Sequence, residues 1–336
     1  MKNYILSAFL FLFSSFCFAD DEYKINYNIK GVNLDASNIH PMMVITNRVL
    51  EIDNTTNEVH LSHEMDTSDI KYLIVTSNKK KPKVKIYSNF HEAFSKIYHD
   101  NLVVHVHGFG QDFNATLRSG ITLQKNYDIN LILFDVPTET VSFNIFSEFK
   151  RSKRYFENST RNFDDFLDDY EVASEYYNVN EKPILFMHSL GNHLLEEYIQ
   201  SEEYQYNKKL AVFENILINA PAVKKKNHAD WIEKIDEDIN IYITVNKKDF
   251  TLKGAEFLTM TRQLGSSKIK NKHLASNATY FTFHTLVGNE HNYFINPTLM
   301  ENRHIKSFYS QILEGKTIID EYYIDNESGI DLVVQN

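Results

Sequence analysis

The sequence predicts an α/β domain with a mainly parallel central sheet and helices on both faces. Apolar runs of strand length alternate with segments whose apolar residues have helical spacing, as expected when a covering helix follows each strand. The 336 residues are 43% hydrophobic, which is enough for the core of one large domain. Glycine is scarce (10 residues) while phenylalanine is abundant (24 residues), so the composition excludes a fibrous or disordered chain.

The expected elements follow a simple order. Early strands are predicted over residues 42–52, 72–76 and 84–87, and central strands over residues 102–106, 131–136, 184–187, 216–218, 241–245 and 280–283. Buried helix faces are predicted at Phe163, Phe166, Leu167, Tyr170 and Ala173 and at Leu194, Leu195, Tyr198 and Ile199. The chain is therefore expected to divide into N-terminal strands that begin the sheet (20–98), a core (99–315) and a C-terminal tail (316–336).

The N-terminus, residues 1–19, has the pattern of a secretory signal peptide. The apolar stretch over residues 4–18 follows Lys2 and precedes the small residue Ala19. Cleavage after Ala19 would remove Cys17, the only cysteine, and leave no thiol for a disulfide. A lipoprotein signal fits poorly, because small residues are expected before the cysteine, and about 15 apolar residues fall short of the roughly 20 that a spanning helix needs. We expect export to the periplasm or beyond.

The formal charge of −10 argues against a nucleic-acid surface. A basic run over residues 79–85 is most simply a solvated loop, although it would also suit contact with an anionic membrane surface.

The most informative segment is residues 183–195. A buried apolar run ends at His188-Ser189-Leu190-Gly191, and an amphipathic segment follows at once, which indicates a strand, a sharp turn and a helix. Such a turn, a nucleophile elbow, projects a serine hydroxyl into a site and supplies one oxyanion donor. Met187 stands where the first glycine of G-x-S-x-G is usual, so a bulky side chain must be fitted there.

A second glycine-bearing turn follows the strand over residues 102–106. His107 and Gly108 begin an oxyanion loop in this interpretation, because glycines let backbone amides turn inward without a Cβ clash. The amides of Phe109 and Leu190 would then be the donors to a negative oxygen. A plain strand-to-helix loop with Asp112 as helix N-cap is compatible with the same residues.

An acid and a base are expected after later strands, in that order. Asp249 follows the strand over residues 241–245 and could orient a histidine, or could simply cap the next helix. His291, after the last central strand, is the predicted general base for Ser189. His284 is the alternative base, and Asp135 the alternative acid.

These pieces are similar to bacterial α/β-hydrolases that were catalogued as a domain of unknown function and are often described as esterase/lipase superfamily enzymes. The matching pieces are Ile45 to Arg48, His105 to Phe109, Leu131 to Pro137, His188 to Asn192, Asn246 to Asp249 and His291 to Phe294. The resemblance spans roughly residues 42 to 313 and implies an α/β-hydrolase fold with Ser189 as nucleophile, Asp249 as acid and His291 as base.

The predicted function is a secreted serine hydrolase that cleaves a small-molecule or lipid acyl ester through an acyl-enzyme, without a cofactor. The segment over residues 138–162, in which aromatic and basic residues alternate irregularly, is a lid candidate whose aromatic side chains could line an acyl pocket or pack the loop down. The sequence specifies neither the acyl chain length nor the oligomeric state.

Two other classes of function are considered. A metal site could use His105-x-His107 or His60-x-x-His63. The signal is weak, because the acidic residue and the further histidine that a binuclear hydrolase would place close to His105 and His107 are absent, so no metal is expected. A binding or interaction protein that keeps the fold without catalysis is the main alternative, and Met187 at the elbow is the hint for it.

Overall fold

The computed structural model describes residues 22–25, 40–56, 58–78, 81–268, 274–283, 286–318 and 330–333. The predicted signal peptide over residues 1–19, with Cys17, and the alternative base His284 lie outside the described residues, as does part of the basic run over residues 79–85. Within the described part, none of the helices combines the length and the apolar character that crossing a membrane requires.

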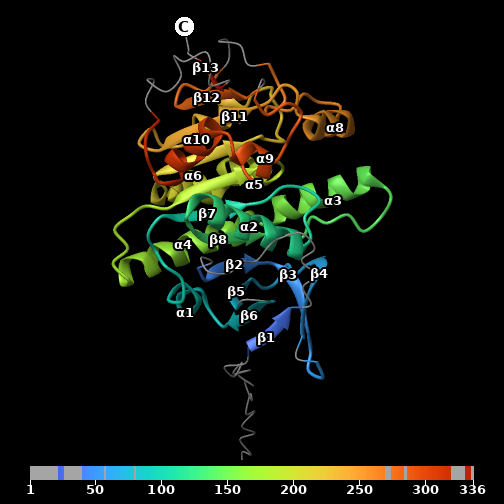
Figure 1. Cartoon of the computed structure of the whole chain (residues 1–336), viewed down its shortest axis with the longest axis vertical. Coiled ribbons are helices and arrows are strands. Elements are labelled where there is room, and N and C mark those ends of the chain that lie inside the picture. Colours follow the sequence, from blue (N-terminus) through green and yellow to red (C-terminus); the bar gives the residue numbers. More distant parts are fainter. Residues whose placement is uncertain are drawn as a thin grey trace, which may run out of the picture.

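The described strands form one sheet in the order β13-β12-β11-β10-β9-β7-β8-β2-β5-β6-β1-β4-β3 (Figure 1). Their bounds are β1 (Glu22–Ile25), β2 (Met42–Thr46), β3 (Arg48–Asp53), β4 (Glu58–Met65), β5 (Lys71–Asn78), β6 (Lys81–Tyr87), β7 (Leu102–Val106), β8 (Asn130–Asp135), β9 (Ile184–His188), β10 (Asn215–Asn219), β11 (Asn240–Val245), β12 (Ala278–Phe283) and β13 (Ile330–Val333).

The centre of the sheet, from β12 through β11, β10, β9, β7 and β8 to β2, is entirely parallel. Every residue of β2, β7, β8, β9 and β10 is buried, as expected for strands covered on both faces. The carboxyl ends of parallel strands lie at one edge, so the loops that follow β7, β9, β11 and β12 can meet there.

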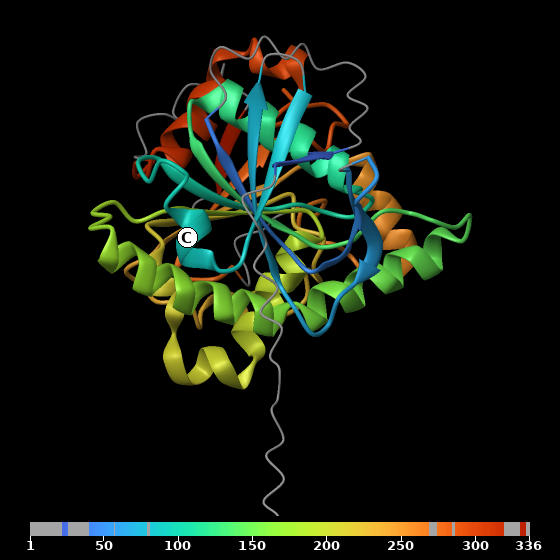
Figure 2. The same cartoon turned by 90° about the horizontal axis from the view of Figure 1, so that it is seen from below.

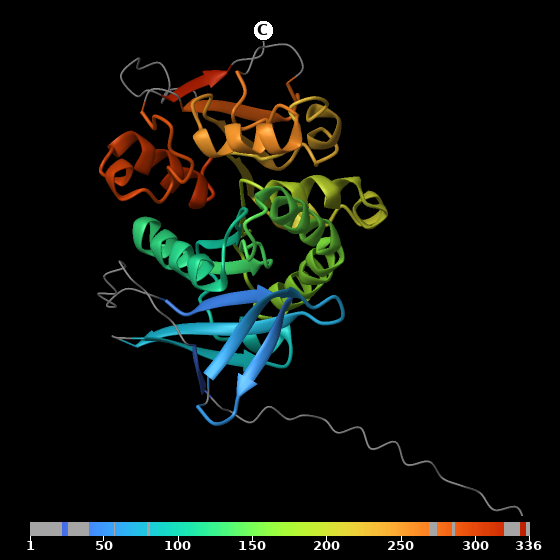
Figure 3. The same ribbon diagram turned by 90° about the vertical axis from the view of Figure 1, so that its right-hand side faces the viewer.

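Helices cover both faces of the sheet (Figures 2 and 3). The helix α10 contacts α2 and α9 on one face, whereas α5 contacts α3, α4, α6 and α7 on the other. The helices are α1 (Phe90–Phe94), α2 (Phe113–Tyr127), α3 (Ile145–Asn158), α4 (Thr160–Tyr176), α5 (Gly191–Gln200), α6 (Glu202–Asn207), the 3-10 helix η2 (Lys209–Val212), α7 (Ala229–Ile232), α8 (Phe250–Thr259), α9 (Pro297–Met300) and α10 (Arg303–Leu313). The predicted α/β class is thus confirmed.

The two ends of the sheet differ from the prediction. The single strand expected over residues 42–52 is two strands, because the chain leaves the buried centre at Asn47 and β3 pairs instead with β4 in an antiparallel hairpin. The strand β4 has buried, partly buried and exposed positions in irregular order, which hides the period of two that identifies a strand. At the other end, residues 330–333 of the predicted tail form β13 beside β12.

The segment over residues 138–162, expected to be irregular, is helical for most of its length, since α3 occupies residues 145–158. The Asn144 side chain caps this helix by accepting from the Ser147 amide. Phe149, Ser152 and Phe156 form the buried face with spacings of three and four residues. A serine in that face, among many basic residues, obscured the helical pattern in the sequence.

Candidate active site

Ser189 lies in the turn between β9 and α5, with a φ of +53°. This left-handed conformation is unfavourable for a residue with a Cβ and persists only where the surroundings hold it. The Ser189 amide donates to the Asn219 carbonyl at 3.0 Å, and the Ser189 carbonyl accepts from the amides of Asn192 and Ala222. Backbone bonds from β10 and α5 therefore hold the predicted elbow.

The elbow requires glycine at only one of its two usual positions. A Cβ on Gly191 would lie 2.6 Å from the His107 carbonyl oxygen, so a side chain here would push α5 away from β7. Met187, in the place of the usual first glycine, is fully buried within β9 and packs into the core. The bulky residue is accommodated without exposing the turn.

The loop after β7 lies directly against the elbow. A Cβ on Gly108 would be 2.7 Å from the Ser189 Cβ and 3.1 Å from its Oγ, so glycine permits this approach. The Gly108 carbonyl accepts from His107 Nδ1 at 2.8 Å and from Thr138 Oγ1 at 2.9 Å. In a trans peptide the N–H points opposite to the carbonyl, so these two bonds also fix the direction of the Phe109 amide.

The amides of Phe109 and Leu190 donate to no other residue in the described part of the chain. Leu190 follows Ser189 in the chain, and Phe109 follows Gly108, whose backbone lies so close to the Ser189 side chain that an added Cβ would be 3.1 Å from the hydroxyl oxygen. Two free amides beside one hydroxyl are the arrangement that an oxyanion requires.

Asp249 and His291 come together from the loops after β11 and β12. His291 Nδ1 lies 2.6 Å from Asp249 Oδ2, and the Asp249 side chain is fully buried. The other carboxylate oxygen, Oδ1, accepts from the Leu252 amide at 2.9 Å and so caps α8. The Asp249 carboxylate therefore contacts His291 with one oxygen and caps α8 with the other. Asn246 donates from Nδ2 to the carbonyls of Gly288 and Glu290, which fastens the loop before His291 to the end of β11.

His188, which precedes Ser189, connects this histidine to the elbow. The rings of His188 and His291 are 4.7 Å apart between centroids. Desolvation, with a smaller electrostatic contribution from the neighbouring His291, holds the pKa of His188 well below 6.5, so this buried imidazole is neutral.

Hydrogen bonds define the tautomer of His188. The Asn219 Oδ1 accepts from the hydroxyls of Thr244 and Tyr309, at 2.8 and 2.6 Å, so its Nδ2 donates to His188 Nδ1. The proton of neutral His188 is therefore on Nε2, which donates to Asn292 Oδ1 at 2.9 Å. Because Asn292 follows His291, this chain of bonds ties the elbow to the loop of the predicted base. No local pattern in the sequence indicates this chain of hydrogen bonds.

Asp135, the alternative acid, points elsewhere. Its Oδ2 accepts from Arg48 Nε at 2.7 Å, and its Oδ1 lies 3.1 Å from His107 Nε2. Burial would raise the Asp135 pKa, but the charges of Arg48 and His107 outweigh it and hold the pKa below 3.8. Arg48 also binds the Glu139 carboxylate and the carbonyl of Gln111. This buried ion pair supports the loop after β7 instead of orienting His291.

Neither histidine pair suggested for a metal forms such a site in the described structure. The pairing of β3 with β4 shifts register between Leu61 and Met65, and among the described residues neither His60 nor His63 belongs to a cluster of possible metal ligands. His105 Nδ1 donates to the Phe186 carbonyl at 3.1 Å. Three other side chains, Glu157, His193 and Glu197, are close enough to share an ion, but Lys153 Nζ already lies 3.5 Å from Glu157.

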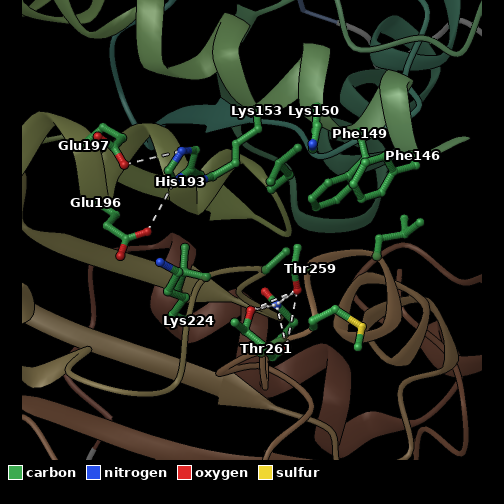
Figure 4. Close-up of a pocket in the computed structure, with 16 residues that line it drawn as sticks. Phe146, Phe149, Lys150, Lys153, His193, Glu196, Glu197, Lys224, Thr259 and Thr261 are labelled. Carbon is green, nitrogen blue, oxygen red and sulfur yellow. Dashed lines mark hydrogen bonds and ion pairs between the residues drawn. The ribbon is translucent and has the colours of Figure 1, made fainter.

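A pocket of about 390 Å³ opens beside the elbow (Figure 4). Leu190 belongs to its lining, as does Ala222, whose amide binds the Ser189 carbonyl. Phe146 and Phe149 of α3 form one wall, opposite the end of α8. The aromatic residues of the segment over residues 138–162 have two different environments. Phe146 and Phe149 line the pocket, whereas Phe156 packs in the core.

The parallel sheet, the elbow after β9 and the loops around it define an α/β hydrolase as the class of protein. A family model described as "Alpha/beta hydrolase of unknown function (DUF900)" matches residues 83–307, which is more than half of the chain. The chain belongs to this family, which confirms the resemblance seen in the sequence. No curated protein and no solved structure gave a significant match.

Proposed function

We propose that this α/β hydrolase is a serine esterase that acts through Ser189, His291 and Asp249. The observation that carries the proposal is the 2.6 Å contact between His291 Nδ1 and buried Asp249, with the His291 ring 4.7 Å from that of His188, the residue before Ser189. A carboxylate on Nδ1 holds the histidine with Nε2 free to accept the serine proton. A histidine held in this way can act as the general base for a serine nucleophile.

The proposed reaction has two steps. The Ser189 Oγ attacks the ester carbonyl carbon while His291 Nε2 takes its proton, and the amides of Phe109 and Leu190 bind the resulting oxyanion. Collapse of this intermediate breaks the bond to the alcohol, which leaves with the proton from His291. Water, deprotonated by His291, then attacks the acyl-serine and releases the acid. The two steps together consume one ester and one water and release one alcohol and one acid, and no other reactant is needed.

The pocket beside Leu190 supports an apolar acyl group as the part of the substrate that is bound. Phe146, Phe149, Leu258 and Met260 contribute apolar surface to its lining. Such a lining favours a lipid or another ester with an apolar chain. The signal-like segment over residues 1–19 supports export, which intact-mass analysis of protein recovered from the producing cells would test by a start at Asp20.

The first experiment is hydrolysis of p-nitrophenyl esters of graded chain length by the protein and by Ser189→Ala. We expect turnover that the variant loses while its circular dichroism spectrum is unchanged, and covalent labelling of Ser189 by a fluorophosphonate. If the wild-type protein neither turns over an ester nor labels, the proposal fails and the binding-protein alternative stands.

A further inference from the structure

The exposed apolar side chains of this protein are unevenly distributed. Seven of the eleven large ones among the described residues fall in two short segments. The first segment, here called the α3 rim, contains Val141, Phe143, Ile145 and Phe146; the second, the α8 rim, contains Phe250, Phe257 and Met260. Exposed apolar groups are common singly, but a gathering of them marks an interaction site.

Both rims border the mouth of the same pocket. Phe146 of the α3 rim and Met260 of the α8 rim belong to the pocket lining. The helices α3 and α8 project on the same side of the molecule, to the right in Figure 1 and toward the viewer in Figure 3. Phe250 and Phe257 are seven residues apart in α8 and therefore lie on one face of the helix. The two rims thus form one apolar surface around the pocket.

The rims are also basic, in a chain with a formal charge of −10. Residues 140–154 contain four basic side chains, of which Arg151 is paired with Glu148 and Lys153 with Glu157, so the positive charge of this segment rests on Lys150 and Arg154. Residues 247–262 contain four basic side chains and two acidic ones, and the acidic Asp249 is buried against His291. Lys150 Nζ lies 4.2 Å from the centre of the Phe146 ring, so positive charge and aromatic surface are directly adjacent.

We propose that the two rims dock the protein on an anionic lipid–water interface, with the pocket mouth facing the lipid. Aromatic side chains that insert and lysines that meet the headgroups are the combination by which proteins bind such surfaces. A second copy of the chain is a poor occupant, because a symmetric contact would bring the two basic rims together. The Phe143 side chain, fully exposed before α3, would insert first.

Flotation with lipid vesicles tests the proposal in the Ser189→Ala background, so that no lipid is consumed and binding is separated from the proposed catalysis. We expect binding to phosphatidylcholine vesicles that contain about one third phosphatidylglycerol, and weaker binding to phosphatidylcholine alone by about fivefold for each basic residue at the surface. High salt should weaken the binding, because it screens the charges.

The double variant Phe143→Ser/Phe257→Ser should lose about tenfold in partitioning for each ring removed. The matched control is Val172→Ser/Tyr206→Ser, which removes exposed apolar side chains outside the rims and should bind as before. Thermal melts check that both variants are folded. Absence of vesicle binding, or equal losses in the two double variants, would overturn the proposal; a dimer that only the Phe143→Ser/Phe257→Ser change dissociates, without vesicle binding, would instead identify the rims as a self-association surface.

Discussion

Asp249 Oδ2 lies 2.6 Å from Nδ1 of His291, a residue 42 positions later in the chain. The same carboxylate caps α8 through Oδ1, which accepts from the Leu252 amide. Helix capping fixes the rotamer of Asp249, and the fixed rotamer in turn orients His291. A structural role and a positioning role are therefore coupled in one side chain, and substitutions can separate them.

Asp249→Asn keeps an oxygen for the helix cap but replaces the oxygen at His291 by an NH₂ group, which cannot accept. We expect kcat for ester hydrolysis to fall by about 10³- to 10⁴-fold, because the histidine then adopts the wrong tautomer. Stability should change little, since asparagine caps helices as well as aspartate does. Ester kinetics and thermal melts check the two effects.

Asp249→Ala is the comparison variant. It loses the cap as well and should cost about 1 kcal/mol more in unfolding free energy than Asp249→Asn, with a similar loss of rate. Unchanged kcat in both variants would show that Asp249 is only a cap.

Gly108 provides a test of the oxyanion loop. In Gly108→Ala the new Cβ would meet the Ser189 Cβ at 2.7 Å, so either the loop or the serine must shift. A displaced Phe109 amide should cost about 10²-fold or more in kcat, as loss of an oxyanion donor does. Gly254→Ala is the matched control, because that helical glycine has open space around its Cα and alanine there should stabilise the fold by up to about 1 kcal/mol. Equal activity in the two variants would exclude Gly108 from the site.

The sequence predicted the elements around the site better than the contacts that support them. The buried runs that end at Val106, His188 and Val245 are central parallel strands, and such runs are visible because both faces are apolar. The apolar side chain of Met187 also fits its position, because Met187 lies in the buried strand β9. These features depend on residues that are neighbours in the chain.

Contacts over long sequence separations could not be predicted. Arg48 and Asp135 are 87 residues apart, and His188 and Asn292 are 104 apart. The residues next to each of these four in the chain do not indicate which distant partner it contacts. The helix α3 escaped prediction for a different reason, since its buried face includes Ser152 and its exposed face begins with apolar residues.

Buried neutral histidines should make the fold sensitive to mild acid. Desolvation, with repulsion from His107, lowers the pKa of His105 to about 3, and desolvation likewise lowers that of His188. Below about pH 6.5 the unfolded chain binds protons at these positions and the folded chain does not, so stability is present above that pH and is lost as the pH falls. Each histidine should contribute a fall of about 1.4 kcal/mol per pH unit.

His105→Asn isolates one of these contributions, because asparagine can still donate to the Phe186 carbonyl but does not titrate. Urea unfolding between about pH 7 and pH 5 should give a plot of unfolding free energy against pH that is flatter for the variant by about 1.4 kcal/mol per unit. Parallel plots for the two proteins would mean that folding does not lower the pKa of His105.

Arg48 is the residue whose loss should damage the fold most. Its side chain and that of Asp135 are both fully buried, so Arg48→Met leaves a carboxylate in the interior with only His107 and the Thr46 hydroxyl among its described side-chain partners. Removing one member of a buried ion pair costs about 3–5 kcal/mol. We expect urea unfolding at neutral pH to show a loss of this size.

The pH dependence of that loss identifies its cause. In the wild-type protein the pKa of Asp135 is held below 3.8, so its contribution is present above that value. Without Arg48, burial raises the pKa, and protonation of Asp135 relieves the buried charge as the pH falls. The stability difference between the two proteins should therefore shrink toward about pH 4. Adding Asp135→Asn to Arg48→Met should recover part of the loss at neutral pH, because the amide carries no charge. A difference that is constant with pH, with no recovery in the double variant, would attribute the loss to the packing of Arg48 and not to the ion pair.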